Sequence, residues 1–423
     1  MAATERRQGE VGEDEVLRSN VRLLQLAGAW PPTAPRGLGR LFPLHLASVY
    51  LSQLANIAMA LRLMQTARGD MHEITQALMN AMTLVGGILK LLHLSTHVPA
   101  YRRLVLALRD VIRIQRHQCE RDPHVASLLA RAHRKALRLT FWPIAYLNML
   151  ALGWYSIPVV FWALGWEKRL LPFFTLHGVD SYDFVLYAAI YFVQCHAIFY
   201  WCFISIGQDM FFVTCMVHVA AQLQILNARL SNLGGGQGAS NELGRLYSCR
   251  AEEDGPCERK PISDTMYTEL RNCIKTHQEI LKFVQLLQQV MSPVAMAQFL
   301  CSVGAACVTL YQATFNPEGN SSLKCLMYLP IPAFQIFVYC WGGHELMENE
   351  ENIGSVRACR SSASQWLFAG RRVTSSLRTL MCRAQRPLLL HAGKLYPVSR
   401  DTFLSLINAS FSFYTVLRHM NNR

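Results

Sequence analysis

Apolar residues gather along the chain in long runs that are separated by polar and basic stretches. Windows of about 19 residues place such runs at 41–61, 74–94, 139–163, 184–206, 285–312 and 325–343. Each run approaches the roughly 20 residues that an α-helix needs to cross a bilayer core. A seventh, shorter run at 402–417 is rich in Ser, Thr and Asn, so one of its faces is suited to water. The pattern predicts an all-α membrane protein with seven transmembrane helices.

The segment before the last run carries residues that interrupt helices. Pro387, Gly393 and Pro397 follow one another closely there. Proline lacks a backbone N–H and clashes with the preceding helical turn, so a continuous helix cannot pass through. We therefore expect residues 401–423 to form a separate last helix.

Basic residues alternate between the two sides that the spans define. Thirty-one Lys and Arg residues lie in 1–40, 93–138, 207–283 and 345–386, against five in the intervening loops. Cytoplasmic flanks of membrane proteins carry the positive excess. The N-terminus is thus predicted in the cytoplasm and the C-terminus outside, the reverse of a G-protein-coupled receptor. The net charge of +13 is read as this topology signal, and no nucleic-acid partner is expected.

This topology divides the chain into six parts. They are a cytoplasmic N-terminal segment (1–40), transmembrane helices one to four (41–206), cytoplasmic helical extensions with a flexible loop (207–284), transmembrane helices five and six (285–344), a cytoplasmic anchor region (345–400) and the last transmembrane helix (401–423).

Two apolar stripes mark the cytoplasmic extensions as helical. One runs through Met216, Val219, Leu223, Leu226, Leu230 and Leu233, and the other through Leu270, Ile274, His277, Leu281 and Val284. Spacings of three and four residues put each stripe on one helix face. The stripes either pack on each other within one subunit or build a cytoplasmic oligomerisation domain. Both alternatives stay open on the sequence.

No sequence motif in a suitable setting indicates that this chain is an enzyme. HExxH, GxSxG, P-loop and GxGxxG patterns are absent from any suitable setting, and His344-Glu345 lacks the second histidine of a zinc protease. The 13 Cys residues include no CxxC pair of a zinc site. We expect a non-enzymatic protein with no metal and no cofactor.

Several segments together resemble the insect odorant receptor family. NVRLLQLAGAWPP ends in the family's Gly-x-Trp-Pro turn, and the stretch after the fourth run carries its Asp, His, Gln-Leu and Arg-Leu pattern at Asp209, His218, Gln222 and Arg229. LRNCIKTHQEILKF and Trp366 add to the match. The most specific part is RAQRPLLLHAGKLYPVSRDTFLSLINASFSFYTVLRHM. The second cytoplasmic excursion is shorter, and the last helix is more polar, than in the family's co-receptor. In both features the chain resembles a tuning subunit.

The resemblance implies an odorant-gated, nonselective cation channel in the plasma membrane of olfactory sensory neurons. This multi-pass subunit would bind a small volatile odorant and form a heterotetramer with the co-receptor among the membrane lipids. A gustatory-type receptor channel is the first alternative and a G-protein-coupled receptor the second. In the family the pocket lies in the outer half of spans two, three, four and six. From their expected depth in the membrane alone, the candidate ligand residues are Met79, Met82, Thr83, Gly153, Trp154, Ile157, Tyr187, Tyr191, Met327 and Tyr328.

The last helix is the pore candidate under this resemblance. Alignment with the family's gate pattern makes Val416 and Met420 the candidate constriction, because a narrow apolar ring closes a pore by dewetting. Ser412 shares their helix face, and His419 lies close to the outer mouth. The alternative is that its Ser and Asn residues bond to neighbouring helices. Asn320, in the sequon Asn-Ser-Ser, is a glycosylation candidate in a loop predicted outside.

Three charged residues near the inner ends of spans complete the expectations. Lys90 is expected to extend its ammonium into the cytoplasmic headgroups. Asp209 and Glu345 are expected to pair with the basic loops on that side.

Overall fold

The computed structural model describes residues 17–32, 37–67, 71–118, 123–165, 171–173, 183–232, 262–315, 327–354, 371–386 and 388–421. The described residues form helices α2 (Arg18–Leu26), α3 (Phe42–Thr66), α4 (Met71–Thr96), α5 (Val98–Gln118), α6 (Pro123–Ala163), α7 (Phe184–Asn232), α9 (Ile262–Phe315), α11 (Pro330–Gly354), α14 (Arg371–Ala384) and α15 (Arg400–Asn421), with a short 3₁₀ helix η1 (Gly37–Leu41). Strands β1 (His391–Ala392) and β2 (Tyr396–Pro397) pair antiparallel. The candidate Asn320 and the side chain of Met420 lie outside the described residues.

Five helices among the described residues are long and apolar enough to cross a membrane. They cover Gly39–Thr66, Glu73–Thr96, Pro123–Ala163, Phe184–Ser231 and Met266–Thr314. Trp142, Met149 and Trp162 are each at least two-thirds exposed on α6, and so dense an apolar surface fits lipid better than water. The sixth and seventh expected runs form α11 and α15 but are less apolar. Gln335, His344 and Glu345 lower the mean hydropathy of α11, and serines do so in α15.

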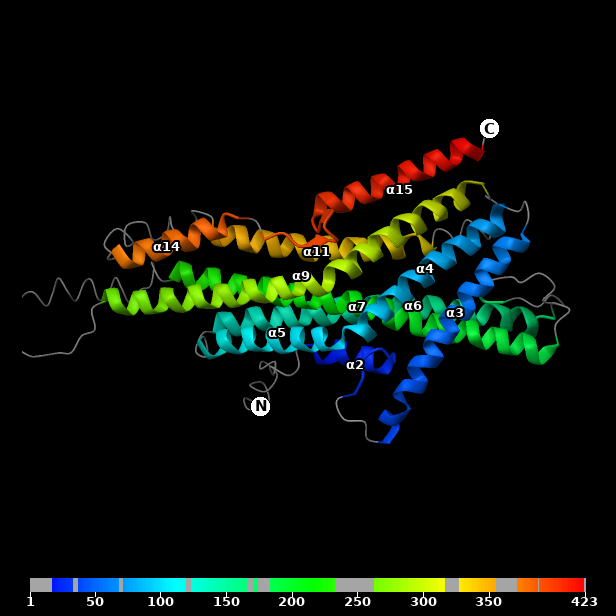
Figure 1. Cartoon of the computed structure of the whole chain (residues 1–423), viewed down its shortest axis with the longest axis horizontal. Helices are drawn as coiled ribbons and strands as arrows, with labels where there is room; N and C mark the ends of the chain where they lie inside the picture. The colour runs from blue at the N-terminus through cyan, green and yellow to red at the C-terminus, as the bar shows by residue number, and fades with distance from the viewer. Residues whose placement is uncertain are drawn as a thin grey trace, which may run out of the picture.

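Helices α7 and α9 continue far beyond their apolar runs. They contain 49 and 54 residues, and at one end of the molecule their extensions lie with α5, α14 and the end of α11 (Figure 1). The described residues of both predicted stripes are buried or half-buried inside this single chain, from Met216 and Leu230 on α7 to Leu270 on α9, while Leu233 lies outside the described residues. An ion pair of 3.2 Å joins Arg229 to Glu269 across the two extensions. Packing within one subunit therefore accounts for the stripes, and an intersubunit anchor stays a prediction.

A hairpin fastened to α9 separates α14 from α15. The Gln288 side chain donates to the His391 carbonyl at 2.9 Å and accepts from the His391 amide at 2.8 Å. One turn further on, Ser292 Oγ donates to the Gly393 carbonyl at 3.0 Å. Gly393 has a φ of +61°, a conformation that only glycine adopts freely. The predicted helix break is confirmed, and α15 leaves the hairpin along the second half of α9 (Figure 1).

Alanine substitutions at two glycines are expected to have different effects on the stability of the fold. A Cβ on Gly343 of α11 would collide with the Val398 carbonyl oxygen, whereas a Cβ on Gly153 of α6 would meet nothing within 4 Å. We expect Gly343→Ala to lower the stability by about 1–3 kcal/mol, the usual cost of overpacking. Gly153→Ala should be neutral or raise it by up to about 1 kcal/mol, because alanine is the better helix former. The unfolding temperatures of the two variants in detergent test this, and equal shifts would contradict it.

Candidate ligand-binding site

A cavity lies among α3, α4, α6, α7 and the start of α11. The space open to water-sized groups is about 120 Å³, which corresponds to on the order of ten water molecules. Its wall is mostly apolar and consists of Asn56, Gln76, Met79, Asn80, Thr83, Leu84, Leu147, Leu150, Ala151, Trp154, Pro172, Phe173, Ile198, Trp201, Cys202, Gln312, Met327, Tyr328 and Ile331. An apolar enclosure with few polar groups is the usual form of a small-molecule site.

The polar groups of this wall are held in place by hydrogen bonds. Trp201 Nε1 donates to the Thr83 carbonyl at 2.9 Å, and the Thr83 and Tyr328 hydroxyls bond to each other. Asn56 is fully buried, and its amide nitrogen donates to the Ser52 carbonyl at 2.8 Å. The Asn56 Oδ1 atom has no hydrogen-bond partner among the described residues. The wall thus offers a fixed aromatic frame to a bound molecule, with the Asn56 side chain beside it.

Five of the ten nominated ligand residues line this cavity, and five lie elsewhere. Met79, Thr83, Trp154, Met327 and Tyr328 belong to the wall, whereas Met82, Gly153, Ile157, Tyr187 and Tyr191 do not. Met82 lies against Gly304 of α9. Tyr191 donates to the Tyr155 carbonyl at 2.7 Å, two helical turns from the wall residue Ile198. Ligand contact for any of the ten stays a prediction.

Several wall residues that the sequence missed lie on the same helix faces as those it found. Gln76 and Asn80 precede Met79 and Thr83 by three residues each, on α4. On α6, Leu147 and Ala151 precede Trp154 by seven and three residues. These spacings place the residues on one face of a helix. They can be found from the sequence by stepping three, four or seven residues along the helix from each predicted ligand residue.

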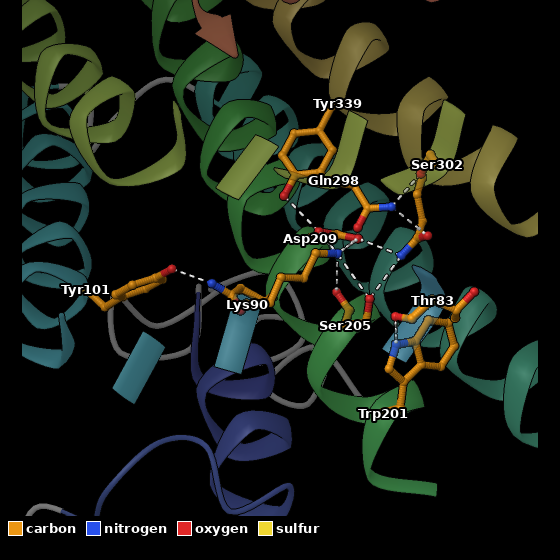
Figure 2. Close-up of polar contacts among 11 residues, drawn as sticks. Thr83, Lys90, Tyr101, Trp201, Ser205, Asp209, Gln298, Ser302 and Tyr339 are labelled. Carbon is orange, nitrogen blue, oxygen red and sulfur yellow. Dashed lines mark hydrogen bonds and ion pairs between the residues drawn. The ribbon is translucent and has the colours of Figure 1, made fainter. Parts of the chain in front are cut away.

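A buried ion pair lies deeper in the bundle, between α4 and α7 (Figure 2). Lys90 Nζ is 2.7 Å from the Asp209 carboxylate, and both side chains are fully buried. Lys90 also donates to Ser205 Oγ at 3.1 Å, while Tyr339 and Gln335 donate to the two oxygens of Asp209 at 2.8 and 3.0 Å. A buried charge is tolerated only when it is paired and hydrogen-bonded in this way.

The ion pair corrects the expectation for Lys90 and for one of the two acids. Lys90 does not extend to headgroups, since it is 1% exposed and bound to Asp209. Asp209 accordingly does not pair with a basic loop. Glu345 does pair with a residue of the basic stretch 93–138, because Lys135 lies 2.8 Å from its carboxylate in a partly exposed pair, but that residue belongs to helix α6 and not to a loop.

Helix α15 packs on the rest of the chain along one narrow face. Thr402, Leu406, Ser410 and Tyr414 are buried at four-residue intervals. The nominated Ser412, Val416 and His419 are exposed in the single chain, with Val416 at 56%. Their place at a pore stays a prediction, as does that of Met420.

Comparison with known proteins agrees with this architecture. A family model described as 7tm Odorant receptor matches residues 70–411. Odorant receptor Or2 of Anopheles gambiae is 26% identical over 60% of this chain and 62% of its own length. Odorant receptor 10 of Aedes albopictus is 26% identical over 60% of this chain and 61% of its own. The matches thus span about three-fifths of these two relatives.

Solved structures share the fold over nearly the full chain. The insect olfactory receptor OR5 from Machilis hrabei, in complex with eugenol, superposes with a TM-score of 0.70. The match covers 96% of this chain and 97% of that one at 16% identity. The two chains therefore share one all-helical fold. The chain belongs to the 7tm odorant receptor family.

Proposed function

We propose that this chain is an odorant receptor subunit that binds a small volatile molecule and opens a nonselective cation channel together with a co-receptor. It acts in the plasma membrane of olfactory sensory neurons, with its N-terminus in the cytoplasm. Seven helices cross the bilayer in this proposal, namely α3, α4, α6, α7, α9, α11 and α15. The charge contrast between the two flanks, thirty-one basic residues against five, supports that orientation.

The cavity is the observation that carries the proposal. Its wall of aromatic, Met and Leu side chains around a volume of about 120 Å³ suits a molecule of on the order of ten non-hydrogen atoms. Such a molecule is small and apolar enough to be volatile. The olfactory receptor of Machilis hrabei, which shares the fold, was solved with eugenol. For this chain we propose Met79, Thr83, Trp154, Met327 and Tyr328 as ligand contacts.

Helix α15 is the proposed pore-lining element. Leu404 and Phe411, seven residues apart, are more than half exposed on one face of it, and Ser405, Ser412 and Val416 are exposed on the next face, at spacings of seven and four residues. A helix with one packed face and two uncovered faces of different polarity suits a position between neighbouring subunits and water. We propose that Val416 and Met420 form the closable apolar ring, with Ser412 and His419 on the water-facing side.

Expression in an electrically silent cell, with and without the co-receptor, tests the proposal. A panel of volatile compounds should evoke cation currents only when both subunits are present. Currents from this chain alone would favour a gustatory-type channel. Currents abolished by blocking G proteins would favour a G-protein-coupled receptor, and either result would contradict the proposal.

A further inference from the structure

A second, smaller cavity lies directly behind the first. Its volume of about 20 Å³ matches one water molecule or one hydroxyl group. Thr83, Trp201, Tyr328 and Ile331 line both cavities, so the two spaces adjoin at these residues. The rest of its wall includes the polar side chains Ser205, Gln298, Ser302 and Gln335. Figure 2 shows Ser205, Gln298 and Ser302 near the buried ion pair, with Thr83 and Trp201 beside them.

Hydrogen-bond donors remain uncommitted among these polar side chains. Ser205 Oγ accepts from Lys90 at 3.1 Å and from Gln335 at 3.2 Å, so its own proton has no acceptor among the described residues. Ser302 Oγ accepts from Gln298 Nε2 at 2.6 Å, and its proton likewise has none there. A hydroxyl has one donor and two acceptor positions. The two serines can therefore each donate to an oxygen atom placed in the small cavity.

Tyr328, which lines both cavities, contributes a hydrogen-bond acceptor. Thr83 Oγ1 uses its proton on the Met79 carbonyl at 2.9 Å. In the bond between the two hydroxyls, Tyr328 is consequently the donor and Thr83 the acceptor. The Tyr328 oxygen keeps a lone pair for a further group. A hydroxyl in the small cavity thus meets two donors and one acceptor.

We propose that the small cavity is a polar subsite for one oxygen atom of the ligand, resting on the function proposed above. A water molecule fills it before the ligand arrives, and the hydroxyl or carbonyl oxygen of an otherwise apolar ligand replaces that water. The apolar body of the ligand stays in the larger cavity. The receptor is accordingly tuned to oxygenated volatiles, alcohols and ketones, over hydrocarbons of the same length.

Ser302 offers a variant that removes one donor with little structural cost. When Ser302 is replaced by alanine, Gln298 Nε2 keeps its second bond to Gln335 Oε1 at 2.8 Å. Thr309→Val is the matched control, because Thr309 is buried on the same helix outside both cavities and bonds only its own helix, at the Ala305 carbonyl. A receptor site that hydrogen-bonds a polar ligand group discriminates against analogues without that group.

The experiment records concentration–response curves for straight-chain alcohols, methyl ketones and alkanes of equal length, in cells that also express the co-receptor. The wild type should respond to the oxygenated compounds at concentrations at least about tenfold lower than to the alkanes. Ser302→Ala should raise the half-maximal concentrations of alcohols and ketones about three- to tenfold and leave those of alkanes unchanged. Thr309→Val should change neither. Equal sensitivity to both series, or equal shifts in both, would overturn the subsite.

Thermal stabilisation of the purified receptor separates this proposal from the channel function. A bound ligand raises the unfolding temperature whether or not a channel opens. Stabilisation by alcohols that weakens in Ser302→Ala supports the subsite even if no current is seen, in which case only the channel proposal fails. Absence of both current and stabilisation across the two series contradicts both proposals.

Discussion

Asp209→Ala is expected to lose most of the folded receptor. The substitution leaves the Lys90 ammonium, 0% exposed in its side chain, without its counter-charge. It also removes the acceptor of the Tyr339 and Gln335 hydrogen bonds. Removing one partner of a buried ion pair costs about 3–5 kcal/mol, which is a large part of the stability of an ordinary domain. Size-exclusion chromatography of a fluorescently tagged receptor measures the loss directly.

The chain supplies a matched control for this prediction. Lys135 and Glu345 form a pair of similar length, 2.8 Å, but with side chains 41% and 20% exposed. Water screens such a pair, so Glu345→Ala should cost no more than about 1 kcal/mol. The double variant Lys90→Met, Asp209→Leu should recover part of the folded fraction, because no uncompensated charge remains. A wild-type folded fraction in Asp209→Ala alone would show that the ion pair does not stabilise the bundle.

Ala151→Phe is expected to raise the half-maximal odorant concentration about 30-fold or to abolish the response. Ala151 is 6% exposed and lines the larger cavity. The added ring takes the place of about six ligand atoms, at roughly 0.3 kcal/mol each, a loss of about 2 kcal/mol that corresponds to the stated factor. Currents recorded with the co-receptor give the measurement.

The neighbouring Leu152 provides the control for the filled cavity. Leu152 is 64% exposed and lies outside the cavity wall. Leu152→Phe places the same ring at the next position of α6, and it should leave both sensitivity and surface expression unchanged. If the two variants shift the response equally, the effect comes from α6 as a whole and the cavity is not the ligand site.

Local sequence pattern predicted the helices well because it reports burial along one segment at a time. All seven apolar runs form helices, and the residues alone predict the helix break at Gly393. The depth of a residue in the bundle was harder to derive. Tyr191 was nominated for the ligand site but lies two turns from Ile198, the nearest wall position after it on its helix face.

Partners that lie far apart in the chain escaped the sequence entirely. Lys90 looks like a residue near a membrane edge, and Asp209, its partner, is 119 residues away. Only the packing of α4 on α7 brings the two charges together. The small polar cavity has the same origin, since Ser205, Ser302 and Gln335 come from α7, α9 and α11. Helical periodicity assigns each residue to a face of its helix, but it does not show which faces pack against each other.

A structure of the receptor bound to an activating odorant tests the central claim most directly. We expect ligand density in the cavity among α4, α6, α7 and α11, in contact with Trp154 and Tyr328. Density for the activating compound on the lipid-facing surface or beside α15, with that cavity empty, would contradict the account.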